Sequence, residues 1–333
     1  MALMTSNVVF LVFSLTIVLL SCELFVNSVE WLGRKLRVGD GVIGSLFSAV
    51  GTCIPETSIP IIAIIFSGRL ETANEISVGA ITGAPFMLST LAFLITGLGV
   101  LLFSRTRKTG TVLNINPAIF KRDLSFFVFA YSMGILASFL EKGLLRHIIA
   151  ISLPVCYLVY VFFTIKGDRD SGIKPEKLFI RRVLSLRSNK TAIMMQLALS
   201  MGGIITGAEL FVGEISRISR EVGISALILS LIIAPVATEL PEKFNSIIWT
   251  RKNRDMLALG NITGAMVFQS CIPVAIGITA TAWDLGQTAL TSAFLAIASA
   301  LINLTWVQLK GRLSVVPLLT GGILYVLFII MIL

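Results

Sequence analysis

The feature that most constrains this chain is a series of ten apolar segments, each long enough to cross a lipid bilayer. They fall at roughly 7–32, 41–67, 75–103, 123–141, 145–165, 191–216, 224–249, 256–282, 287–309 and 314–333. Of the 333 residues, 56% are hydrophobic and 14% are charged, which is more apolar surface than a soluble fold of this size can bury. We therefore predict an all-α integral membrane protein with ten transmembrane helices.

The basic residues divide unequally between the two sides of the predicted membrane. Of 27 lysines and arginines, 21 fall in connections on one side, and Lys243 alone lies in the interior of a span. The other side holds Arg69, Lys142, Arg146, Arg217 and Arg220. Because basic connections tend to stay in the cytoplasm, we expect both termini to be extracytoplasmic in a multi-pass protein of the cell membrane. The net charge of +9 is then topology information and indicates no nucleic-acid partner.

The chain repeats one pattern in two halves, residues 1–166 and 191–333. The segment 167–190 between them is basic, contains glycine and proline, and is predicted to be a cytoplasmic linker. Residues 52–56, Thr-Cys-Ile-Pro-Glu, align with 238–242, Thr-Glu-Leu-Pro-Glu, at an offset of 186, and 79–84 align with 260–265 after a five-residue shortening. Five spans per half is an odd number, so the halves insert in opposite orientations, as in many secondary transporters.

Glu56 and Glu242 occupy equivalent positions in the two halves, each directly after a proline and about halfway along an apolar span. An ionised carboxylate there costs several kcal/mol unless it is paired. Thr52 and Thr238 lie four residues before the carboxylates and Asn245 three residues after Glu242, on the same helix faces. Together with carbonyl groups freed by the prolines, these oxygens suit Ca²⁺. We predict a shared cation site; the competing interpretation is that the glutamates are protonated or hydrogen-bonded packing residues.

Glu239 and Lys243 allow two interpretations. Their spacing, with the acid four residues before the base, favours an ion pair on one face of the seventh span. Alternatively, Glu239 turns toward the cation as a further ligand, and Lys243 is a tethered positive charge that alters the ion stoichiometry. Pro241 lies between them, so ideal helical spacing does not decide between the two.

At these residues the sequence resembles the calcium/cation antiporter superfamily, especially its prokaryotic sodium/calcium exchangers. The resemblance is carried by 51–56 and 79–85 in the first half and by 237–242 and 260–266 in the second, within alpha-motifs at 51–93 and 237–274. By position it implies that the calcium-binding glutamates are Glu56 and Glu242 and the motif threonines Thr52 and Thr238. It also implies the remaining metal-ligand positions, Cys53, Glu239 and Gln269, with Leu88 as the first-half equivalent of Gln269.

The resemblance implies a sodium/calcium exchanger-like fold of two inverted five-helix repeats, with the first and sixth spans sliding over the other eight. It implies a monomer in the lipid bilayer that exchanges Ca²⁺ for monovalent cations by alternating access, with no permanently bound cofactor. Na⁺ is the expected counter-ion. Because Ala84 and Ala265 replace serines of the family, H⁺ or K⁺ coupling, or a passive cation channel on the same scaffold, are alternative interpretations. The single histidine, His147, leaves no arrangement for an intramembrane enzyme.

Overall fold

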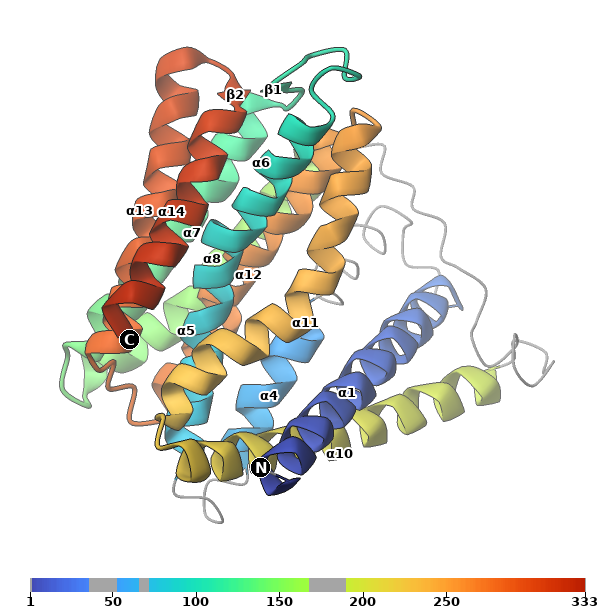
Figure 1. Cartoon of the computed structure of the whole chain (residues 1–333), viewed down its shortest axis with the longest axis vertical. Helices are drawn as coiled ribbons and strands as arrows, with labels where there is room; N and C mark the ends of the chain where they lie inside the picture. The colour runs from blue at the N-terminus through green and yellow to red at the C-terminus, as the bar shows by residue number, and fades with distance from the viewer. Residues whose placement is uncertain (1, 36–52, 66–71, 168–189, 333) are drawn as a thin grey trace.

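The structure is a computed structural model that describes residues 2–35, 53–65, 72–167 and 190–332 (Figure 1). In chain order its elements are α1 (Ala2–Lys35), α4 (Ile54–Ile65), α5 (Ala73–Met87), the π-helix η3 (Leu88–Ala92), α6 (Phe93–Leu102), β1 (Val112–Leu113), α7 (Pro117–Ser138), α8 (Leu144–Gly167), α10 (Lys190–Val222), α11 (Ala226–Arg251), α12 (Asp255–Ala280), α13 (Gln287–Lys310), β2 (Leu313–Ser314) and α14 (Val315–Ile332). Each predicted span contains a described helix, and seven of the described helices are long and apolar enough to cross a membrane. Most of the predicted linker, and residues 41–52 and 66–67 of the second predicted span, lie outside the described residues.

Side chains that suit lipid cover the outside of the bundle. On α8, Leu144, Ile151 and Leu158 are 77%, 68% and 65% exposed, and their spacing of seven residues places them along one stripe of the helix. A water-soluble protein rarely exposes apolar side chains in such continuous stripes. The stripe therefore fits contact with acyl chains.

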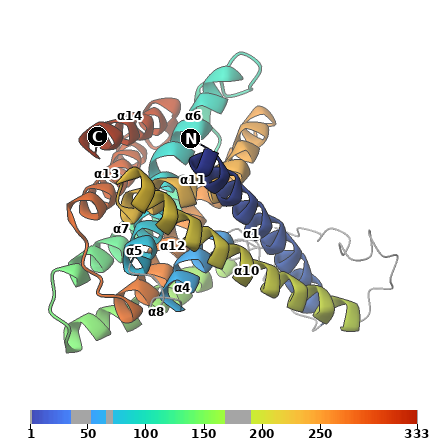
Figure 2. The same cartoon turned by 60° about the horizontal axis from the view of Figure 1, so that its bottom comes forward.

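Two long helices, α1 and α10, stand apart from the rest of the bundle. They pack against each other along their length and lean away from the other helices at one end (Figures 1 and 2). Their buried side chains, such as Val18 and Phe211, form a core with α4 and the adjoining parts of α5 and α11. This core is distinct from the larger one that α5–α8 and α12–α14 share. The first helices of the two halves thus form one unit.

Close contact between α5 and α11 joins the two halves at their centre. A Cβ atom on Gly79 would lie 2.5 Å from the carbonyl oxygen of Leu227, and one on Gly83 would overlap the carbonyl of Leu231. Ser230 on α11 donates a hydrogen bond of 2.8 Å to the carbonyl of Ile76. Glycine is therefore required on α5 for the backbones to approach this closely.

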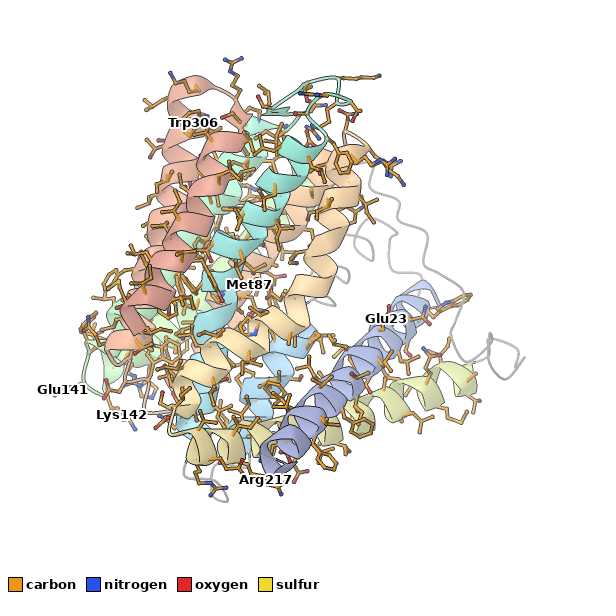
Figure 3. The ribbon with its side chains drawn as sticks, in the orientation of Figure 1. Glu23, Met87, Glu141, Lys142, Arg217 and Trp306 are labelled. Carbon is orange, nitrogen blue, oxygen red and sulfur yellow. The ribbon has the colours of Figure 1, made fainter. Side chains whose placement is uncertain are left out.

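The third predicted span is interrupted, which the sequence analysis did not predict. Its α-helix gives way to η3, and the π-turn is fixed from outside the span. Ser299 on α13 donates to the carbonyl of Ser89 at 2.5 Å, and Gly321 on α14 lies so close that a Cβ atom there would be 2.6 Å from the carbonyl oxygen of Thr90. Such π-turns occur often at functional sites. Met87, just before η3, lies near mid-height of the molecule (Figure 3).

A short strand pair closes one end of the bundle. β1 and β2 pair antiparallel, with Val112 opposite Ser314 and Leu113 opposite Leu313. Lys142 and Arg217, which belong to the less basic side, lie at the opposite end of the molecule (Figures 1 and 3). The two ends of the structure therefore agree with the division of connections that the basic residues predict.

Candidate cation-binding site

Glu56 lies in the first turn of α4. The helix begins at Ile54, so Pro55 stands where no backbone donor is needed, and the carboxylate stands at the positive end of the helix dipole. Glu56 is buried, at 4% exposure, and so is Cys53 just before the helix. The amide and hydroxyl of Thr57 both donate to the Cys53 carbonyl, at 3.1 and 2.7 Å. The proline thus starts a helix whose first turn carries a buried carboxylate.

On α11, Thr238 and Glu239 are both buried. The Thr238 hydroxyl donates to the carbonyl of Ala234 at 2.9 Å, which still leaves its oxygen able to accept or to bind a cation. Figure 1 shows α11 bent partway along its length. Pro235 and Pro241 lie in this stretch, and their missing amide donors account for a bend.

Two further buried polar groups lie on α11 and α12. Gln269 on α12 is 1% exposed, and its Nε2 has no hydrogen-bond partner among the described residues. Ser246 on α11 is fully buried, and its hydroxyl likewise lacks a described partner. Ser246 lies seven residues after Glu239, on the same side of the helix. Leaving such a group unsatisfied costs about 1–3 kcal/mol, so the Ser246 hydroxyl fits a group that binds an ion or its water, and the Gln269 amide fits a group that donates to such a water.

Helix packing brings the predicted ligands of the two halves to one region. α4 contacts both α11 and α12, which places Glu56, Glu239 and Gln269 on mutually packed helices. Thr52 lies outside the described residues, as do the side chains of Glu242 and Asn245 on α11. The side chains that are described include no group of three or more His, Cys, Asp or Glu able to hold a metal ion by itself. The complete ligand set, with Glu242 in it, stays a prediction.

Lys243, for which an ion pair with Glu239 is one of two interpretations, makes its described hydrogen bond to α12. Its side chain is 1% exposed, and Nζ donates to Oδ1 of Asn261 on α12 at 2.8 Å. Asn261 was not among the predicted partners of Lys243. The repeat contained a signal for this partner: Asn261 is a polar residue at a position where the first half has the apolar Ala80.

Among known protein families, the model described as sodium/calcium exchanger protein matches residues 6–166 and 193–333. The chain belongs to this family. The exchanger is therefore a member of the calcium/cation antiporter superfamily, a Ca²⁺/cation exchanger and not an enzyme, as its resemblance implied.

Relatives of this exchanger match most of its length. CaxA of Alkalimonas amylolytica is 25% identical over 323 residues, which cover 96% of both chains. Sodium/calcium exchanger MaX1 of Methanosarcina acetivorans is 23% identical over 295 residues, 80% of both chains.

Solved structures of two exchangers share the fold. The H⁺/Ca²⁺ exchanger CAX superposes with a TM-score of 0.75 at 16% identity, covering 97% of this chain and 81% of that one. The sodium-calcium exchanger NCX_Mj superposes with a TM-score of 0.58 at 18% identity, covering 98% of both. The predicted exchanger-like helical membrane fold is thereby confirmed.

Proposed function

We propose that this exchanger moves Ca²⁺ against monovalent cations by alternating access, with Na⁺ as the counter-ion. The observation that carries the proposal is the buried carboxylate of Glu56 on a helix packed against α11, which supplies Glu239 and Thr238. The sodium/calcium exchanger family model and the relative MaX1 support Na⁺. In each half-cycle the same carboxylates hold either Ca²⁺ or the counter-ions.

Competition for these carboxylates is sufficient to couple the two fluxes. A buried carboxylate without a cation costs several kcal/mol, so a carrier with an empty site does not readily pass between its inward-open and outward-open states. Each passage therefore carries one kind of cation. The α1–α10 pair is the proposed moving part, because the core that it shares with α4 and parts of α5 and α11 is distinct from the larger core of the bundle.

H⁺ is the second candidate counter-ion. The positions that are serines in the family motif are the buried alanines Ala84 and Ala265, which offer no side-chain oxygen to Na⁺. Glu239 instead adds a buried carboxylate, a group that can carry a proton. A proton gradient must therefore be tested beside Na⁺ and K⁺ gradients.

The test is uptake of radioactive Ca²⁺ into proteoliposomes under imposed Na⁺, K⁺ or H⁺ gradients. We expect wild-type uptake to require one of these gradients. Glu56→Gln should weaken Ca²⁺ binding by about 100-fold or more, because a buried charged ligand is lost. Glu141→Gln is the matched control and should behave as wild type, because Glu141 lies at the end of the bundle (Figure 3). Wild-type uptake that is independent of every gradient would identify a passive channel instead.

A further inference from the structure

The second half of the exchanger carries charged and polar side chains where the first half is neutral or apolar. Glu239, Lys243, Asn261 and Gln269 stand where the first half has Cys53, Thr57, Ala80 and Leu88. Three of the four, Glu239, Lys243 and Gln269, are at most 2% exposed, and all four lie on α11 or α12. At these four positions the second half therefore departs from the repeat on helices that also carry predicted ligands.

Lys243 is the only basic residue away from the ends of a predicted span, and it lies directly after Glu242. Its ammonium is held by the amide oxygen of Asn261 at 2.8 Å. Arg107 with Asp255 and Arg217 with Glu214 form ion pairs in other parts of the structure. A buried ammonium costs several kcal/mol unless negative charge surrounds it. The nearby acidic residues in sequence are Glu239 and Glu242, both predicted ligands of the transported cation.

We propose that the Lys243 ammonium is a built-in monovalent cation of the transport site and takes the place of one counter-ion in each exchange cycle. This proposal rests on the proposed function. The amide oxygen of Asn261 is a ligand that a free monovalent cation would use. The Lys243 ammonium already donates a hydrogen bond to this oxygen.

The charges of the predicted ligands also indicate that Lys243 replaces one counter-ion. Glu56, Glu239 and Glu242 bring three negative charges when ionised, and Lys243 returns one positive charge. Two further positive charges neutralise the site, and either one Ca²⁺ or two monovalent cations supply them. Without the lysine charge, the same carboxylates accommodate one more monovalent cation.

The experiment measures the exchange stoichiometry of the purified full-length protein in proteoliposomes. The membrane voltage is held at zero by an ionophore for an ion other than the counter-ion, and the final Ca²⁺ ratio is read at a tenfold counter-ion gradient. One additional counter-ion per Ca²⁺ changes that final ratio by about tenfold, because the free energies of the two gradients balance at equilibrium. This readout is independent of the transport rate.

Lys243→Gln removes the charge and keeps a donor for Asn261, so we expect one more counter-ion per Ca²⁺. Lys243→Arg keeps the charge and should keep the wild-type stoichiometry. The double variant Glu239→Gln/Lys243→Gln removes one charge of each sign and should also return the wild-type value. Lys252→Gln, at the exposed end of α11, is the control and should change nothing.

An unchanged stoichiometry in folded Lys243→Gln overturns the proposal and makes Lys243 a structural hydrogen-bond donor. If that variant does not fold, the charge-balanced double variant decides, because any departure from the wild-type stoichiometry there contradicts the charge count. A wild-type protein without counter-ion dependence overturns the proposed function itself, which is a separate result.

Discussion

Gln269 occupies a buried position on α12 that is leucine in the first half. Its Nε2 has no described hydrogen-bond partner, so the side chain costs folding free energy unless a water or another acceptor oxygen takes its hydrogen bond. We expect Gln269→Leu to leave thermal stability unchanged or higher, and to lower the apparent Ca²⁺ affinity by about tenfold, the equivalent of one net hydrogen bond or ligand contact to a charge.

Ca²⁺-dependent uptake and thermal unfolding in detergent measure the two effects on the same Gln269→Leu sample. Ser270→Ala is the control, because the Ser270 hydroxyl donates within its own helix to the carbonyl of Val267. A loss of stability without a change in affinity would assign Gln269 to packing alone.

Repetition in the sequence predicts which polar residues are buried better than it predicts their partners. The burial of Glu56 and Thr238 follows from two proline-glutamate motifs at matched depth. The partner of Lys243 does not follow, because spacing along one helix identifies neighbours on that helix only. Asn261 reaches Lys243 through the packing of α12 on α11, a contact that depends on the whole bundle.

Among the elements, the two halves differ in how tightly their helices approach. A Cβ atom on Gly83 would overlap the backbone of Leu231, whereas one on Gly260 would meet no described atom within 4 Å. We expect Gly83→Ala to destabilise the fold by about 1–3 kcal/mol through overpacking. Gly260→Ala should be neutral or stabilise α12 by up to about 1 kcal/mol. Thermal unfolding of both variants tests the contact, and equal melting temperatures would contradict it.

A buried ion pair fastens the connection after α6 to the start of α12. The Arg107 guanidinium binds the Asp255 carboxylate at 2.6 and 2.8 Å, with both side chains fully buried, and also donates to the carbonyl of Thr250. Asp255 further accepts from the amide of Asn114 at 2.7 Å. The guanidinium and carboxylate therefore neutralise each other away from the candidate cation site.

We expect Asp255→Asn to destabilise the fold by about 3–5 kcal/mol, because it leaves a buried guanidinium without its counter-charge. Arg217→Gln breaks the Arg217–Glu214 pair, in which Arg217 is 61% exposed, and should cost less than about 1 kcal/mol. The two melting temperatures, compared with wild type, measure the difference. A similar small shift in both would show that burial adds nothing to the first pair.

The π-helix η3 could not be predicted from its own segment. Residues 75–103 read as one apolar span, and Pro85 is the only proline in it. The groups that fix the π-turn, Ser299 and Gly321, come from α13 and α14 more than 200 residues later. Local sequence patterns therefore predict the helix, and tertiary contacts decide its irregular turn.

At the scale of the whole molecule, the excess of basic residues predicts that both termini are extracytoplasmic. In Figure 1 both chain ends lie toward the end of the molecule that carries Lys142 and Arg217 in Figure 3. We expect alkaline phosphatase to be active when fused to the C-terminus, and green fluorescent protein at the same point to be dark in bacteria. The reverse pattern would invert the orientation. Fusions after Gly110, on the predicted cytoplasmic side, provide the internal control.

The hydrogen bond between Lys243 and Asn261 also limits how freely this exchanger can evolve. Two copies of the first half would lack the lysine, its amide partner and Glu239, whereas two copies of the second half would bury two ammonium groups in one site. Neither duplication reproduces the present ion balance. The halves have become complementary parts, so random substitution at Lys243 and Asn261 should be poorly tolerated.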